Sequence, residues 1–334
     1  MKQAFGKLSD GTEANLWTLE NENVMMQVTD FGAALVSLKD KKTGIDIVQG
    51  FADVKGYEDT RGICFGASIG RTANRTAKGR FTLNGKEYQL FINNNGNSLH
   101  GGEYGFDRKL FAGKEEGNSV VFTRLSPDGE ENYPGNLEVK ITYTLLADGV
   151  SILSEGTPDA DTLFSYTNHT YFNLEQSESI LDHQLMIPAE YYALSDENGM
   201  MREIPVPVEE TPFDFRKFTA IGARIDADDE QIRFGAGYDH WYPVAGEGMR
   251  LMADLKSEKE ELIVESDFPG VHIYTSNWFD GYNGKYGVFY PKRSSIALEA
   301  SYQPNAINYE TAVKPVVRAG ETLTHEIRFR VKAL

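Results

Sequence analysis

A single cysteine, Cys64, occurs among the 334 residues, so the chain can form neither an internal disulfide framework nor a cluster of thiolate metal ligands. Cys64 stands in the apolar run Gly-Ile-Cys-Phe-Gly-Ala, and a cysteine in such a run usually packs as a small hydrophobic residue. No histidine motif adjoins it. We therefore expect a packed thiol rather than a catalytic one.

Long apolar runs are also missing. No stretch approaches the roughly 18 apolar residues that are needed to cross a bilayer. The first residues lack the apolar core of a signal peptide. We therefore expect a cytoplasmic protein with no membrane partner.

Basic residues are in deficit, since 33 Lys plus Arg stand against 50 Asp plus Glu, a formal net charge of −17. Nucleic acid and anionic lipid both require a basic surface, so neither is an expected partner. The balance suits a small or neutral ligand, although it is equally typical of a surface that only confers solubility. The Gly-x-Gly-x-x-Gly and Walker motifs do not occur, and we expect no nucleotide and no other cofactor.

The chain is rich instead in strand and turn patterns. Asn84-Gly85 separates two short β-prone runs between residues 81 and 90, which predicts a tight hairpin. A second hairpin is expected where Asp148-Gly149 joins the alternating segment 137–146 to 150–153. Further strands are expected at 34–38, 119–123, 262–264 and 324–331.

Helix signals are few. The segment 218–233 is the best candidate for a helix, and 55–60 could form a short turn. Regular strand–helix alternation is absent, which disfavours a doubly wound α/β fold. No low-complexity linker divides the chain. The expected fold class is all-β: a single domain over residues 1–334, built as a large antiparallel β-sandwich with few short helices.

Five segments place amide, hydroxyl or ionisable side chains among small or apolar residues: 70–75, 97–102, 167–174, 238–242 and 294–301. His100 and His169 are the most informative residues in them, because such a histidine can exchange a proton or hold a hydroxyl near neutral pH. Glu299 interrupts an apolar stretch, so it is either a paired core acid or a catalytic group with a raised pKa. Arg71 and Arg75 offer donors for ligand oxygens.

Together these residues could bind a polyhydroxylated ligand and move protons at two places. Any one of the histidines would more often be structural. Two rival interpretations are weaker. His100, His169 and a carboxylate could form a metal site, but no His-x-His or His-x-x-x-His spacing supports it. A nucleophilic triad lacks the Gly-x-Ser-x-Gly elbow that would present its serine.

The chain resembles the aldose 1-epimerase (galactose mutarotase) family over nearly its whole length. Segments 70–75, 97–102 and 168–174 match family motifs almost letter for letter, with the sequences Gly-Arg-Thr-Ala-Asn-Arg, Asn-Ser-Leu-His-Gly-Gly and Asn-His-Thr-Tyr-Phe-Asn-Leu. Segments 238–240, 274–281 and 298–308 complete the set in family order. The resemblance implies a galactose-mutarotase-like β-sandwich that interconverts the α and β anomers of free aldoses such as D-galactose or D-glucose.

By motif position, the resemblance implies that Glu299 is the general base that takes the proton from the anomeric hydroxyl. His169 would be the general acid that protonates the ring oxygen, so that the ring opens and recloses on its other face. An ionised glutamate and a neutral-to-acidic histidine can do this without a metal or a cofactor. Further contacts to the sugar would come from His100, Asn74, Arg75 and Asp239.

Two positions depart from the family. His272 stands where the family commonly has Gln, and Ala300-Ser301 stands where it often has Thr-Gln. Neither change removes the acid or the base, but His272 is expected to contact the substrate and to change which hydroxyl is recognised. The alternatives are non-catalytic carbohydrate binding and epimerisation of a phosphorylated or disaccharide sugar. We expect a monomer or a homodimer.

Overall fold

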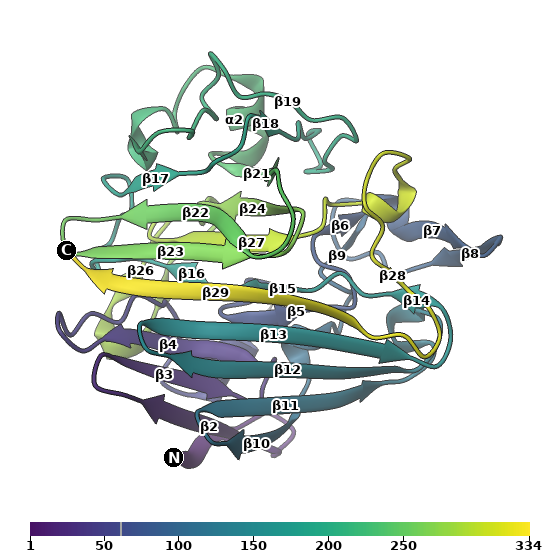
Figure 1. Ribbon diagram of the computed structural model, residues 1–334, viewed down its shortest axis with the longest axis horizontal. Helices are drawn as coiled ribbons and strands as arrows, with labels where there is room; N and C mark the ends of the chain where they lie inside the picture. The colour runs from purple at the N-terminus through teal and green to yellow at the C-terminus, as the bar shows by residue number, and fades with distance from the viewer. Residues whose placement is uncertain (61) are drawn as a thin grey trace.

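Most of the regular structure is antiparallel strand in the computed structural model, which describes residues 1–60 and 62–334 (Figure 1). The largest sheet has nine strands, and Figure 1 shows the yellow C-terminal strand β29 in its middle. The strands lie in the order β10 (Ala112–Glu116), β11 (Ser119–Ser126), β12 (Leu137–Leu146), β13 (Gly149–Pro158), β29 (Leu323–Ala333), β23 (Glu260–Ser266), β22 (Arg250–Lys256), β17 (Gln184–Met186) and β20 (Thr219–Ala220).

A second layer packs against this sheet. It contains one four-stranded sheet in the order β1 (Lys2–Lys7), β2 (Glu13–Glu20), β3 (Val24–Thr29) and β4 (Ala34–Asp40). It contains another in the order β16 (Tyr171–Phe172), β27 (Ile296–Ser301), β24 (Gly270–Tyr274) and β21 (Asp239–Pro243). The pair β5 (Ala67–Ile69) and β15 (Thr167–His169) lies between them, because Leu35 N donates to Gly66 O and β15 leads directly into β16.

The two layers bury one shared apolar core. Phe122 and Ile152 of the nine-stranded sheet belong to the same buried cluster as Ile273 of β24 and Leu298 of β27. All four side chains are completely buried. Two sheets that interdigitate their inner faces form a β-sandwich, which confirms the predicted fold class.

The predicted hairpins and strands are confirmed. Asn84 and Gly85 adopt the left-handed φ values of +51° and +76° that a two-residue turn requires, and they join β7 (Arg80–Leu83) to β8 (Lys86–Gln89). Strands β12 and β13 pair along their whole length. The other four predicted segments fall in β4, β11, β23 and β29.

The predicted helix over 218–233 is wrong for most of its length. Only α2 (Glu230–Gly235) is helical, preceded by β20 and a 3₁₀ turn at Ile221–Ala223. The carboxylate of Asp229 accepts hydrogen bonds from the backbone N–H groups of Gln231 and Ile232, so this residue caps the helix and sets its start. The predicted turn at 55–60 is α1 (Val54–Asp59).

The remaining elements are short. None of the helices in the part of the chain that the structure describes is long and apolar enough to cross a membrane. The two-stranded pairs are β6 (Arg75–Thr76) with β9 (Ser98–Leu99), β14 (Thr162–Leu163) with β28 (Val316–Val317), β18 (Tyr191–Tyr192) with β19 (Val206–Pro207) and β25 (Tyr282–Asn283) with β26 (Phe289–Tyr290). Further 3₁₀ turns occur at Ala77–Gly79, Phe106–Arg108, Glu130–Asn132, Lys285–Gly287 and Ala306–Asn308.

Candidate active site

A row of five side chains crosses the face of the second layer that points away from the core. Directly opposed residues of antiparallel strands project to the same side. The opposed pairs are Ala67 with His169, Glu299 with His272, and His272 with Trp241. His169 Nε2 lies 3.4 Å from Glu299 Oε1, which joins β15 to β27. We call this set the site row; in order it consists of Ala67, His169, Glu299, His272 and Trp241.

Strand alternation explains why Glu299 belongs to this row. Its neighbours Leu298 and Ala300 are completely buried in the shared core. Successive side chains of a strand point to opposite faces, so packing both neighbours into the core turns the carboxylate to the other side. The apolar neighbours of Glu299 in the sequence therefore determine that its carboxylate points toward the site.

Two loops fix His100 beside the row. The backbone N–H of Asn74 donates to His100 Nδ1 over 3.2 Å, and the backbone N–H of His100 donates to Asn74 O over 3.1 Å. Both residues have left-handed backbone angles, with φ of +57° and +51°. The His100 ring then lies edge-on to the ring of His169, with 5.2 Å between centroids. The structure thus brings the segments around residues 74, 100 and 169 together.

Asp239 and His272 form a close pair at the other end of the row. His272 Nε2 lies 2.6 Å from Asp239 Oδ1, and Asn74 Nδ2 lies 3.4 Å from His272 Nδ1. Burial alone would raise the pKa of Asp239, but the hydrogen bond and charge of His272 lower it to about 2. The ionised carboxylate therefore accepts, and Nε2 of His272 carries the donated proton.

The two arginines of the first motif have different places. Arg75 is half-buried near Asn74, and its Nε donates to Asn94 Oδ1 over 3.0 Å. Arg71 is fully buried, and its guanidinium donates to protein oxygens of Ser126, Pro127, Pro134 and Thr162. The expectation that Arg71 offers donors to a ligand is wrong, because the donors are occupied within the fold.

Burial sets the protonation of the catalytic candidates. Removal from water raises the pKa of Glu299 well above its ordinary value and lowers the pKa of His169 to about 4. It lowers the pKa of His100 as well. Without a ligand, the Glu299–His169 pair therefore favours a neutral carboxyl and a neutral imidazole. This differs from the ionised glutamate expected from the sequence, because the sequence does not show the depth of burial.

The same three residues also lie close enough to share a metal ion. One ligand atom each of His100, His169 and Glu299 lie within 4.8 Å of one another. No local spacing in the sequence could show this, since the residues come from three distant segments. The geometry suits a divalent cation or the adjacent oxygens of a sugar, and chelation is therefore part of the experiment below.

Sequence reasoning missed Ala67, the first residue of the site row. Its signal was faint, a run of small residues over 66–68 beside the first motif. The residue matters because a small side chain next to His169 leaves space that a larger one would fill. Cys64 is buried and burial raises the pKa of its thiol, as expected for a packed cysteine.

Comparisons with known proteins agree along nearly the whole chain. A family model described as Aldose 1-epimerase matches residues 15–330. The galactose mutarotase of Mus musculus is 37% identical over 339 residues, covering 98% of this chain and 97% of the mouse protein. The aldose 1-epimerase of Haemophilus influenzae is 36% identical and covers 92% of each chain. The crystal structure of galactose 1-epimerase from Lactobacillus acidophilus matches with a TM-score of 0.87 and 28% identity, covering 100% of this chain and 99% of that chain.

Proposed function

Because this chain belongs to the aldose 1-epimerase family and is an aldose 1-epimerase, we propose that Glu299 and His169 transfer the protons by which it interconverts the anomers of free hexoses such as D-galactose and D-glucose. The 3.4 Å between Glu299 Oε1 and His169 Nε2 carries the proposal. The anomeric hydroxyl and the ring oxygen of an aldose are bonded to the same carbon, so a base and an acid that serve both must lie close together.

In the reacting form, the one proton that the pair holds lies on His169. In the forward step, the carboxylate of Glu299 takes the proton of the anomeric hydroxyl while the imidazolium of His169 gives its proton to the ring oxygen. The bond between C1 and the ring oxygen breaks, and an open-chain aldehyde results. Rotation about C1–C2 presents the other face of the carbonyl. On reclosure, the former ring oxygen, now the hydroxyl on C5, bonds to C1 and gives its proton to His169. Glu299 gives its proton to the carbonyl oxygen, so the enzyme ends as it began.

The buried environment of the pair favours this step. The raised pKa of Glu299 makes its carboxylate a stronger base, and the lowered pKa of His169 makes its imidazolium a stronger acid. After ring opening both groups are neutral, which is the form that burial favours. Burial therefore lowers the free energy of the open-chain complex relative to the closed complex in which the pair is ionised.

The remaining polar residues would hold the other hydroxyls of the sugar. The ionised carboxylate of Asp239 accepts hydrogen bonds, and the guanidinium of Arg75 donates them. His100 lies beside His169 and would contact the sugar near its ring oxygen. Asn74 and His272 complete this binding set through their contact with each other.

The test measures anomer exchange by polarimetry on freshly dissolved α-D-glucose and α-D-galactose. Glu299→Gln and His169→Asn should each lower kcat by roughly 10²- to 10⁴-fold, because one proton transfer is lost. Glu87→Gln, at an exposed residue of β8, is the matched control and should change nothing. Wild-type protein treated with EDTA should keep its activity.

Activity near wild type in Glu299→Gln or His169→Asn would contradict the assigned roles. Loss of activity with EDTA, restored by a divalent cation, would assign the three-residue cluster to a metal instead. Thermal unfolding of each variant distinguishes a catalytic defect from misfolding.

The single domain, the cytoplasmic location and the monomeric or homodimeric state expected from the sequence remain predictions. One apolar cluster that draws residues from Trp17 to Val331 supports the single domain. A single cooperative unfolding transition would test it. Subcellular fractionation and light scattering would test the other two.

A further inference from the structure

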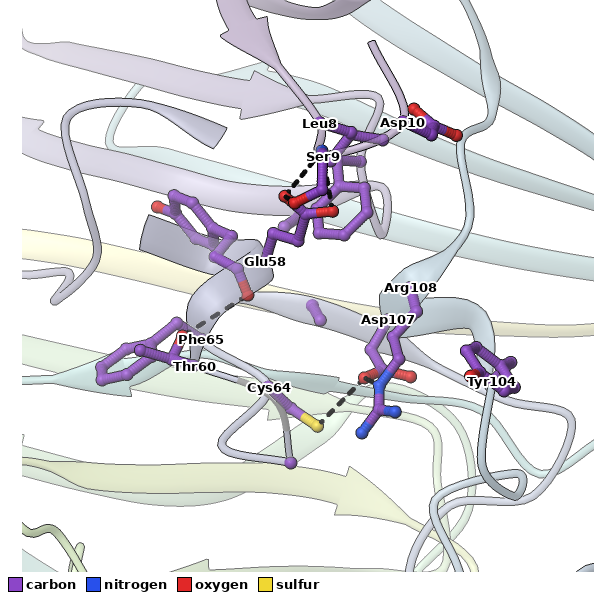
Figure 2. Close-up of a pocket in the computed structure, with 15 residues that line it drawn as sticks. Leu8, Ser9, Asp10, Glu58, Thr60, Cys64, Phe65, Tyr104, Asp107 and Arg108 are labelled. Carbon is purple, nitrogen blue, oxygen red and sulfur yellow. Dashed lines mark hydrogen bonds and ion pairs between the residues drawn. The ribbon is translucent and has the colours of Figure 1, made fainter. Parts of the chain in front are cut away.

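A cavity of about 330 Å³ opens beside the first residue of the site row (Figure 2). Its size is within the range of small-ligand pockets. The inner wall includes the small side chains of Ala34, Cys64 and Ala67. Figure 2 shows Tyr104, Asp107 and Arg108 on one side of it, across from Glu58 and the segment 8–10.

The cavity lies on the same face of the second layer as the catalytic pair. Ala67 is directly opposed to His169, about 5 Å away across the two strands. Phe65, also in the wall, packs its ring 5.0 Å from the ring of Tyr171, and Tyr171 lies 5.0 Å from the ring of His169. The site row therefore leads from Glu299 through His169 to the cavity.

The order Glu299, His169, Ala67 along the site row corresponds to an order of atoms along the sugar. In the proposed mechanism Glu299 meets the hydroxyl on C1, and His169 meets the ring oxygen. In a pyranose the ring oxygen connects C1 to C5, and C5 carries the C6 arm. Continuing past His169 to Ala67 therefore leads from C1 across the ring oxygen to C5 and whatever is attached to C6.

The lining of the cavity suits a neutral, hydroxyl-rich ring. Tyr104 is 48% exposed, with Arg108 Cζ and Lys109 Nζ at 5.9 and 6.0 Å from its ring centroid, and the exposed part of its ring can stack on a sugar face. The carboxyl of Asp107 is largely buried, with Oδ2 3.7 Å from Cys64 Sγ and 3.4 Å from Arg108 Nε. Burial raises the pKa of Asp107, and its carboxyl oxygens can accept hydrogen bonds from hydroxyls.

The charges of the described lining residues disfavour a phosphate. Three carboxyl groups, those of Asp10, Glu58 and Asp107, stand against the one guanidinium of Arg108. Glu58 is further committed to Ser9, whose backbone N–H and hydroxyl both donate to it. Anions on the ligand would therefore be repelled.

We propose that this cavity is a subsite for a second sugar ring joined to the C6 hydroxyl of the aldose, which makes six-linked reducing disaccharides substrates of the enzyme. The inference rests on the proposed roles of Glu299 and His169. Tyr104 stacks on the second ring, and Asp107 accepts hydrogen bonds from its hydroxyls. No covalent step beyond the proposed mutarotation is added.

The experiment measures anomer exchange by ¹H NMR on three sugars: D-glucose, its α-1,6-linked disaccharide and its α-1,4-linked disaccharide. Wild-type kcat/KM should be several-fold higher for the six-linked disaccharide than for the four-linked one. Tyr104→Ala should lower kcat/KM for the six-linked disaccharide by about five-fold, through loss of stacking, and leave D-glucose unchanged. Asp107→Asn provides a second, independent variant.

Tyr191→Ala is the matched control, because Tyr191 is 49% exposed and does not line the cavity. It should change none of the three rates. Equal turnover of the six- and four-linked disaccharides would overturn the subsite, as would equal losses on D-glucose and disaccharide in Tyr104→Ala. If wild-type protein failed to accelerate D-glucose, the proposed catalytic function would be wrong instead.

Discussion

The two faces of the second layer bury their side chains to almost the same extent, but one face is apolar and the other is ionisable. On the core face, Leu298 and Ile273 are completely buried and apolar. On the site face, His169, Glu299 and His272 are only 5%, 2% and 2% exposed, yet all three are ionisable. Burial of apolar area stabilises the fold by about 25 cal/mol per Å², whereas burial of an ionisable group costs free energy. Packing of the apolar face therefore stabilises the same strands whose other face carries the ionisable residues.

The largest effects are expected at two adjacent residues of β27, one on each face. Leu298→Ala should lower the free energy of unfolding by about 2–5 kcal/mol, because a cavity is left in the shared core. Glu299→Gln should leave the free energy of unfolding unchanged or increase it at neutral pH, because a carboxyl with a raised pKa opposes folding when it is ionised. Denaturant unfolding at pH 7 measures both.

Activity should follow the opposite order. Folded Leu298→Ala protein should retain most of its kcat at low temperature, whereas Glu299→Gln should lose it. A stability loss in Glu299→Gln as large as that in Leu298→Ala would contradict the division of labour between the two faces.

A second contrast separates the two arginines of one motif. Arg71→Met should destabilise the protein by on the order of 3 kcal/mol, because the buried oxygens of Ser126 and its neighbours lose their donors. Arg75→Met should raise KM by about ten-fold, equal to about 1.4 kcal/mol of binding, with little change in stability. Thermal unfolding and steady-state kinetics on both variants test the contrast. A ten-fold increase in KM from Arg71→Met without destabilisation would show that Arg71 contacts the sugar.

The smallest effect concerns pH. Burial lowers the pKa of His169 to about 4 and raises that of Glu299, so the pair holds one proton at pH values just above 4. We expect the acid limb of kcat/KM to lie at about pH 4, where protonation of His169 adds a second proton to the pair. Tryptophan fluorescence at each pH serves as the control for folding. An acid limb at the ordinary histidine value of 6.5 would contradict burial as the controlling effect.

Local sequence was informative where local physics decides the structure. Asn84-Gly85 predicted its hairpin because few other residues adopt two successive left-handed angles. The segment 218–233 failed because the helix begins only where Asp229 caps it. Arg71 and Arg75 could not be told apart, since they stand four residues apart in one motif and differ only in what surrounds them.

The sequence by itself determined the strands, the turns and the identity of the polar residues, because alternation and turn chemistry depend on neighbours along the chain. It named His169, Glu299 and His272 before their places were known. Only the tertiary structure put them in one row, since that depends on the pairing of β15, β27 and β24. Only the tertiary structure decided their protonation and the cavity beside Ala67, because burial and empty space are properties of neighbours in space.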